Sequence, residues 1–145
     1  MDIFISYSSK EYEKACMISK VLNDNGITTW MAPGSIPAGS NYTREIPKAI
    51  RECKVFLLLL SAHAQDSLWV SAELENAFKN EKPIIPFVIE HCILKDEFDF
   101  LLSRCQRIEA YEKSADALER LVLRLKALVG THVSTQTPPV FQSSP

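Results

Sequence analysis

The residues with the clearest chemical potential in this sequence are a tryptophan and a glutamate four positions apart, Trp69 and Glu73. On a helix, residues at this spacing lie on the same face, so the indole and the carboxylate are neighbours. A carboxylate held beside an indole is partly desolvated, and it can hydrogen-bond a sugar hydroxyl or stabilise a developing oxocarbenium ion. The alternative is structural: Trp69 is a core anchor, and Glu73 is a solvated residue paired with a nearby lysine.

A second candidate is the segment 32–40, with the sequence Ala-Pro-Gly-Ser-Ile-Pro-Ala-Gly-Ser. Its two prolines and two glycines predict a loop, which is longer than the ~2–6 residues of an ordinary strand–helix connection. One exposed isoleucine, Ile36, on a loop stiffened by prolines suits contact with a partner surface. The alternative is an irregular connector without a role.

The segment 6–9, Ser-Tyr-Ser-Ser, is a third and weaker candidate. Its backbone amides are expected at a helix N-terminus, where they can hold a phosphate. However, Ser8 is explained equally well as a helix cap, with Glu11 completing a capping box. His63 has no companion nucleophile or metal ligand, and His91 beside Cys92 does not make a metal site. The sequence therefore predicts no metal site.

These candidates need elements that bring them together, and the hydrophobic pattern predicts alternating strands and helices. Strands are predicted at residues 3–5, 27–31, 55–60, 83–89 and 106–109. Helices are predicted from Ser8 to about 24, at 41–52 with Pro47 in its first turn or bending it, at 68–80 capped by Asp66 or Ser67, and over 118–129. A short helix is expected within 92–103, with Phe98, Phe100, Leu101 and Leu102 inward. Five such strands call for parallel βαβ units with helices on both faces of the sheet, and ligands then bind beyond the carboxyl ends of the strands.

Length and composition limit the classes of protein to which the chain can belong. Its 145 residues fit one domain, predicted at 1–129, followed by a Thr/Ser/Pro-rich flexible tail or linker at 130–145. The net charge of −2 excludes the broad basic field of a nucleic-acid binder. No apolar run approaches the ~20 residues that span a bilayer, so no membrane segment is expected. The four cysteines are widely spaced, as is typical of reduced thiols in a cytoplasmic protein.

Three motifs in the right order resemble the TIR (Toll/interleukin-1 receptor) domain family, over about residues 1–129. Residues 2–8, D-I-F-I-S-Y-S, resemble its first strand, and residues 30–39, W-M-A-P-G-S-I-P-A-G, resemble its BB loop. Residues 69–74, W-V-S-A-E-L, match the WxxxE motif of the helix that carries the catalytic glutamate. The sequence is most similar to the bacterial members.

The resemblance implies a flavodoxin-like five-stranded parallel sheet with helices on both faces. It also implies cleavage of NAD+ to nicotinamide and ADP-ribose or a cyclic isomer, with Glu73 as the catalytic residue at the ribose. NAD+ is then the substrate, and neither a metal nor a redox cofactor is needed. The implied substrate-binding residues are Ser6, Tyr7, Ser8, Trp30, Pro33, Ser35 and Trp69, and the implied interface residues of the BB loop are Gly34, Ile36 and Pro37.

In this family the site is commonly completed by the BB loop of a neighbouring subunit, so self-association with other TIR domains is expected. Gly34 and Ser35 stand where many members carry Arg-Asp, and this removes charges from that loop. The implied role is an assembly-activated effector of bacterial defence or signalling in the cytoplasm, with a C-terminal sensor domain beyond the tail. The alternative is a non-catalytic TIR scaffold that docks other TIR domains. A phosphate-receiver domain is rejected, because Ser6, Tyr7 and Ser61 stand where that class needs acidic residues.

Overall fold

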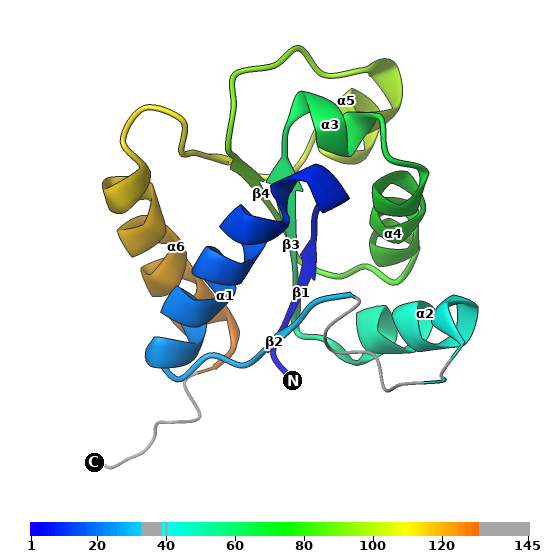
Figure 1. The fold of residues 1–145 in the computed structure, drawn as a ribbon, viewed down its shortest axis with the longest axis horizontal. Coiled ribbons are helices and arrows are strands. Elements are labelled where there is room, and N and C mark those ends of the chain that lie inside the picture. Colours follow the sequence, from blue (N-terminus) through cyan, green and yellow to red (C-terminus); the bar gives the residue numbers. More distant parts are fainter. Residues whose placement is uncertain (33–38, 40, 131–145) are drawn as a thin grey trace.

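Five parallel strands form the centre of the structure, a computed structural model that describes residues 1–32, 39 and 41–130 (Figure 1). The strands are β1 (Ile3–Ser6), β2 (Thr29–Trp30), β3 (Val55–Leu60), β4 (Ile84–Val88) and β5 (Ile108–Glu109). Their order across the sheet is β2-β1-β3-β4-β5, which is the flavodoxin-like order. The predicted fold class is confirmed.

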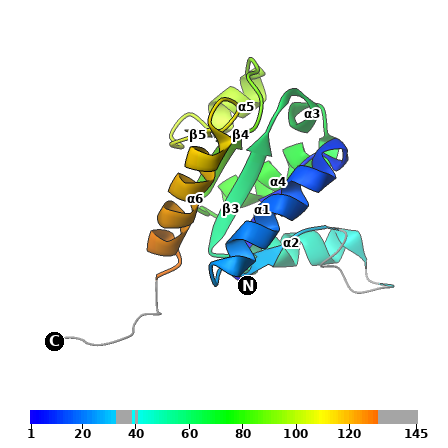
Figure 2. The ribbon, with the colours of Figure 1, turned by 60° about the vertical axis from the view of Figure 1, so that its left-hand side comes forward.

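Helices cover both faces of this sheet, as Figures 1 and 2 show. One face packs against α1 (Tyr12–Asp24) and α6 (Ser114–Leu128), and the other against α2 (Tyr42–Glu52), α4 (Leu68–Lys79) and α5 (Asp96–Leu101). Every residue of β3 is buried, because successive side chains of a strand point to opposite faces and both faces are covered.

Short polar side chains fix where the helices begin. Asn41 precedes α2, and its side-chain oxygen accepts from the backbone N–H of Thr43 at 2.9 Å. Ser67 precedes α4, and its hydroxyl accepts from the backbone N–H of Val70 at 3.2 Å. Each cap satisfies a backbone donor that the first turn leaves free. Of the two caps predicted for α4, Ser67 is confirmed.

The structure differs from the sequence-based prediction in several places. Of the two alternatives for Pro47, a place in the first turn of α2 is wrong, because Pro47 lies inside the helix. The short helix α3 (Ala62–Gln65) was not predicted. Glu11 does not complete a capping box, because its carboxylate accepts from the Ser61 hydroxyl at 2.7 Å. Phe100 is not inward: its side chain is 70% exposed and lies against Phe78, with the ring centroids 6.4 Å apart.

Within the described ranges, no helix is long and apolar enough to cross a membrane. The same residues contain no cluster of three or more histidine, cysteine or acidic side chains that could hold a metal ion. The four cysteines are free thiols.

Candidate active site

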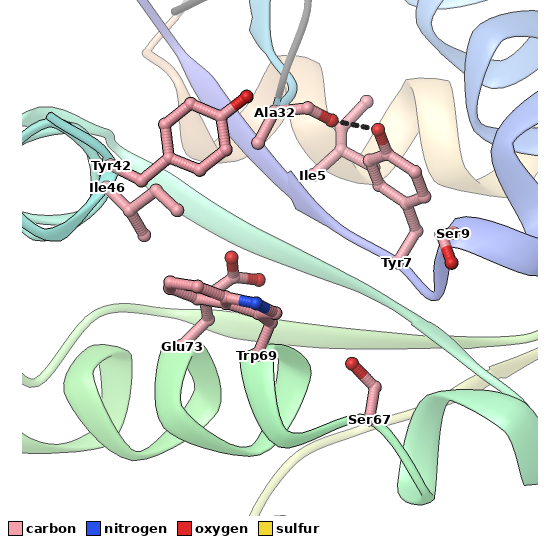
Figure 3. Close-up of a pocket in the computed structure, with 9 residues that line it drawn as sticks. All are labelled: Ile5, Tyr7, Ser9, Ala32, Tyr42, Ile46, Ser67, Trp69 and Glu73. Carbon is pink, nitrogen blue, oxygen red and sulfur yellow. Dashed lines mark hydrogen bonds between the residues drawn. The ribbon is translucent and has the colours of Figure 1, made fainter. Parts of the chain in front are cut away.

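A cavity of about 270 Å³ lies beside β1, between the start of α4 and the start of α2 (Figure 3). Its lining is mostly apolar and aromatic, and consists of Ile5, Tyr7, Ser9, Ala32, Tyr42, Ile46, Ser67, Trp69 and Glu73. Ligand pockets usually measure ~300–1,000 Å³, so the cavity has the size of part of a dinucleotide rather than the whole.

Glu73 is the polar residue of an otherwise apolar stripe of α4. Val70, Leu74 and Ala77 are buried against the sheet, and Glu73 shares their side of the helix because positions i, i+3, i+4 and i+7 coincide on it. The side chain of Glu73 is only 7% exposed. The structural alternative, in which Glu73 is a solvated helix residue, is therefore wrong.

In the part of the chain that the structure describes, a single hydrogen bond holds the Glu73 carboxylate. The hydroxyl of Ser6, the last residue of β1, donates to Oε1 of Glu73 at 2.7 Å. Among the described residues, Oε2 has no hydrogen-bond partner. Figure 3 shows the carboxylate pointing away from α4, toward Tyr42 and Ala32. One oxygen is thus bonded to Ser6, and the other faces the cavity without a partner among the described residues.

Burial changes the acidity of this carboxyl group. Desolvation raises the pKa of Glu73 from its ordinary value of 4.5 to about 7, against the opposing effect of the Ser6 hydrogen bond. The charged form loses hydration when it is buried, while a donated hydrogen bond favours it. Near neutral pH the acid and the carboxylate are therefore close in free energy, which is typical of catalytic carboxyl groups.

Trp69 lies beside Glu73, and its indole forms one wall of the cavity (Figure 3). The side chain is 54% exposed, so the interpretation of Trp69 as a core anchor is wrong. The adjacent indole and carboxylate can contact a planar cationic group, one through its ring face and the other through its charge.

Tyr7 forms the opposite end of the cavity. Its hydroxyl donates to the backbone oxygen of Ala32, which joins the segment after β1 to the segment after β2. Burial raises the pKa of Tyr7 to about 12, with nearby Tyr12 and Cys16 acting in the same direction. The phenol therefore stays neutral at neutral pH, and its ring lines the cavity.

The remaining sequence-predicted residues lie elsewhere or outside the described part of the chain. Ser8 caps the 3-10 helix η1 (Ser9–Glu11), and its hydroxyl accepts from the backbone N–H of Lys10 at 3.2 Å. Trp30 stacks on Phe4 with ring centroids 5.0 Å apart, and it does not line the cavity. The BB-loop predictions fall outside the described residues: Pro33, Gly34, Ser35, Ile36 and Pro37.

Sequence reasoning missed the contribution of α2 to the cavity, through Tyr42 and Ile46. Ile46 carries a usable signal, since it belongs to the buried stripe of α2 with Ala49 and Ile50. Tyr42 carries no such signal, because an exposed tyrosine in the first turn of a helix does not by itself indicate a binding site.

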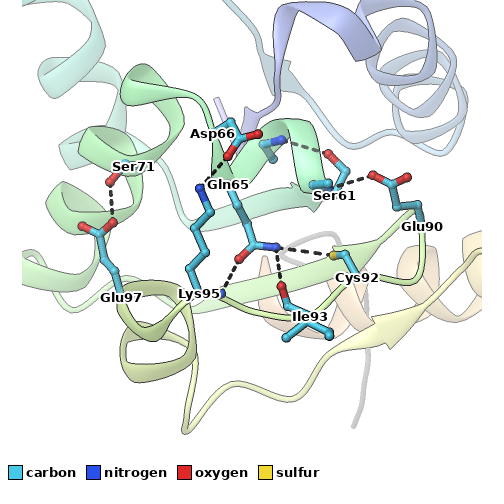
Figure 4. A network of polar contacts seen from close by, with 11 residues as sticks. Ser61, Gln65, Asp66, Ser71, Glu90, Cys92, Ile93, Lys95 and Glu97 are labelled. Carbon is cyan, nitrogen blue, oxygen red and sulfur yellow. Dashed lines mark hydrogen bonds and ion pairs between the residues drawn. The ribbon is translucent and has the colours of Figure 1, made fainter.

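A dense polar network occupies the neighbouring part of the same sheet edge (Figure 4). Its centre is Gln65, which is buried in α3. The Gln65 amide nitrogen donates to the backbone oxygen of Ile93 at 3.1 Å and to the thiol of Cys92 at 3.5 Å, and its oxygen accepts from the backbone N–H of Lys95 at 2.7 Å. Glu90 accepts from the backbone N–H of Ala62 at 2.8 Å. These bonds fasten the loop after β4 to α3.

Comparisons with known proteins agree on the class of domain. A family described as the TIR domain matches residues 3–122, while no curated protein matches the chain. The chain is similar to the solved TIR domain of the Toll-related receptor TRR-2 from Hydra magnipapillata, with a TM-score of 0.73 and 18% identity over 85% of this chain and 95% of that one.

Two further solved structures share the fold. The CMP N-glycosidase BcmB from Clostridium botulinum has a TM-score of 0.62 and 19% identity, over 83% of this chain and 98% of that one. The TIR domain heterodimer of RPS4 and RRS1 has a TM-score of 0.65 and 14% identity, over 88% and 96%.

Proposed function

Since the chain belongs to the TIR domain family, we propose that it cleaves the bond between nicotinamide and ribose in NAD+. The products are nicotinamide and ADP-ribose or a cyclic ADP-ribose isomer. One observation carries the proposal: the Glu73 carboxylate is buried, and one of its oxygens is open to an apolar cavity beside the exposed Trp69 indole. In this proposal the Trp69–Glu73 pair is the WxxxE motif of the bacterial TIR enzymes.

The chemistry needs an anion but no added acid. When the glycosidic bond breaks, its electron pair stays on the pyridinium nitrogen, so nicotinamide leaves as a neutral molecule. Positive charge then develops on the ribose, where the ionised Glu73 stabilises it. Water adds at the same carbon and loses a proton to give ADP-ribose, or a nitrogen of the adenine adds to give the cyclic product.

The cavity walls favour a charged heteroaromatic ring. The indole of Trp69 offers a ring face to a cation, and the lining is largely apolar. A ring bound there displaces water, so that its attraction to Glu73 is less screened. Binding a cation next to Glu73 also favours the carboxylate over the acid, which lowers the pKa of this group once the substrate is bound.

The choice of NAD+ over other nucleotides follows from the leaving group. The related fold of the Clostridium botulinum protein serves a CMP N-glycosidase, so this architecture is compatible with N-glycosidic bond cleavage. The cytosine of CMP is uncharged in the substrate and would leave as an anion unless it is protonated, whereas the nicotinamide of NAD+ is cationic in the substrate and leaves as a neutral molecule. An anionic Glu73 beside an indole suits the second case.

The size of the cavity supports a site shared between subunits. The cavity measures about 270 Å³, so in this proposal it takes the nicotinamide ribose part of NAD+, and the rest of the dinucleotide needs another surface. We propose that a second copy supplies it through its BB loop, with Gly34, Ile36 and Pro37 at the contact. The TIR heterodimer of RPS4 and RRS1 illustrates that domains of this fold pair with one another.

In this scheme the protein is an assembly-activated cytoplasmic effector of bacterial defence or signalling. Residues 130–145 then link the domain to a C-terminal sensor. The second candidate function is a non-catalytic TIR scaffold, which the existence of TIR heterodimers supports.

Nicotinamide release from NAD+ by concentrated protein tests the proposal. Glu73→Gln is expected to lower the rate by about 100-fold or more, since it removes the charge at the developing cation. The matched control is Glu75→Gln, an exposed glutamate of the same helix, which should retain the wild-type rate. A Glu73→Gln protein as active as the control contradicts the role of Glu73, and self-association without any nicotinamide release favours the scaffold.

A further inference from the structure

We propose that Ser6 is a positioning residue for Glu73, which fixes the carboxylate through Oε1 and leaves Oε2 as the oxygen that meets the ribose. This inference rests on the proposed function and deepens it. The resemblance to the family suggests Ser6 as a substrate-binding residue, whereas its contacts in the structure are with Glu73.

The geometry favours an action through Glu73. Ser6 is only 1% exposed and does not line the cavity, so a ligand in the cavity reaches Glu73 before it reaches the Ser6 hydroxyl. The hydroxyl donates to Oε1 at 2.7 Å. Ser6 also belongs to a strand that pairs on both sides, with β2 and with β3, where it lies opposite Leu58. A donor on such a strand holds its partner in one place.

The bond makes the two carboxylate oxygens unequal. Because Oε1 already accepts the hydrogen of Ser6, the proton of the acid form belongs on Oε2, the oxygen without a protein partner among the described residues. A proton on Oε2 would block the contact with the developing cation. Ser6 opposes protonation, because a donated hydrogen bond stabilises the carboxylate and lowers its pKa.

Few other side chains near the cavity could influence the position or the protonation of the Glu73 carboxylate. The titratable side chains that line the cavity with Glu73 are Tyr7, after β1, and Tyr42, in α2. In the part of the chain that the structure describes, no lysine, arginine, histidine or second carboxylate lines the cavity, and the causes of the Glu73 shift are burial and the Ser6 bond. We therefore assign to the hydroxyl of Ser6 the role of holding the Glu73 carboxylate in position and of opposing its protonation.

The chain contains a matched control for this contact. Ser61 follows the neighbouring strand β3, is fully buried, and donates its hydroxyl to Oε1 of Glu11 at 2.7 Å. Neither Ser61 nor Glu11 lines the cavity. Ser61→Ala thus removes a partly buried serine–glutamate bond of the same length, together with the cap of α3, without touching the site.

The experiment measures NAD+ cleavage from pH 5 to pH 9 for the wild-type protein, Ser6→Ala, Ser6→Thr and Ser61→Ala. We expect Ser6→Ala to lower kcat by roughly 10-fold, and to move the acid limb of kcat/KM upward by roughly one pH unit. Ser6→Thr keeps a hydroxyl and should restore the limb. Ser61→Ala should leave the limb unchanged. A raised KM with the wild-type kcat and limb would instead make Ser6 a substrate ligand and overturn the inference.

A second measurement keeps the inference separate from the proposed function. The carboxyl carbon of Glu73 is titrated by NMR in the substrate-free protein, with Ser6→Cys as a variant of similar size and weak donor strength if Ser6→Ala does not fold. An upward shift of the Glu73 titration supports the inference even in a protein that never cleaves NAD+, which would refute only the proposed function. Titration at the wild-type pH in either variant overturns the inference.

Discussion

The cavity around Glu73 and the polar network around Gln65 lie at the same edge of the sheet, and both contain a buried polar side chain. The amide of Gln65 uses its nitrogen and its oxygen in bonds to the loop after β4. Glu73 uses one oxygen in bonds to the residues that the structure describes. A buried polar group whose bonds are all made within the protein holds the fold together, whereas one with an acceptor left open to a cavity is prepared for a ligand.

The strongest test of this comparison asks whether the cavity is complete in one chain. Ile36→Asp is expected to abolish NAD+ cleavage, because an unpaired carboxylate in a contact that must lose water costs ~1–3 kcal/mol at each repeated interface. Nicotinamide release is measured against protein concentration, with sedimentation to follow assembly. The control is Ile93→Asp, the same change at an exposed residue of the network region, which should remain active. A linear dependence on concentration, with an active Ile36→Asp monomer, would show that one chain holds the whole site.

The acidity of Glu73 predicts an effect of pH on stability. The folded protein keeps the Glu73 proton up to a pKa of about 7, and the unfolded chain releases it near 4.5. The unfolded state therefore binds fewer protons across this window, and the free energy of unfolding falls as pH rises, by about 3 kcal/mol in total. In the Glu73→Gln variant the side chain cannot ionise, so the free energy of unfolding should not show this fall with rising pH.

Urea unfolding of wild-type protein and Glu73→Gln at pH 5, 6 and 8 measures this effect. The free energy of unfolding of Glu73→Gln should increase relative to that of the wild type as pH rises, so that the variant is the more stable protein at pH 8. Glu75→Gln, whose glutamate is exposed, should follow the wild type. Parallel pH profiles for wild type and Glu73→Gln would mean that Glu73 is ionised in the folded protein well below neutral pH.

Substitutions of the two tryptophans distinguish a residue of the core from a residue of the candidate site. Trp30→Ala is expected to lower the free energy of unfolding by about 3 kcal/mol, because the indole stacks on Phe4 in the core. Trp69→Ala should cost under about 1 kcal/mol, since the side chain is half exposed, yet it should lower NAD+ cleavage by about 10-fold. Urea unfolding and nicotinamide release, measured on both variants, check the pair. Equal losses of stability in the two variants would mean that Trp69 contributes to the core as Trp30 does.

The smallest expected effect concerns the network. Gln65→Leu leaves the backbone N–H of Lys95 and the backbone oxygen of Ile93 without this partner, which should lower the free energy of unfolding by about 2 kcal/mol. The acid limb of the activity profile should not move, because Gln65 does not line the cavity. A shifted limb would show that the network and the cavity act as one unit.

The architecture was predictable because its signals are local. Apolar runs of strand length gave β1, β3 and β4 nearly to the residue, and such runs need no tertiary information. The short helix α3 was not predicted, because four residues are too few to show a helical pattern of apolar residues. Phe100 was predicted inward from its apolar character, but its exposed ring pairs with Phe78 instead.

The site was predictable in its residues but not in its electrostatics. The spacing of Trp69 and Glu73 indicated a shared face, but not which of the two is buried. The apolar positions Val70, Leu74 and Ala77 contained that information, because Glu73 completes their stripe. The hydrogen bond from Ser6 joins residues 67 positions apart, and such a pairing appears only when the strand and the helix are placed in space.

The position of β1 between β2 and β3 also bears on how the protein folds during synthesis. β1 pairs with β3, which begins at Val55, so one edge of the strand stays unsatisfied until that segment leaves the ribosome. At ~5–20 residues per second, roughly several seconds pass in which the apolar side chains Ile3, Phe4 and Ile5 lack their neighbours. Glu73 is synthesised later still. The serine that we propose to orient the carboxylate is therefore made 67 residues ahead of its partner, and their hydrogen bond can form only after that interval of synthesis.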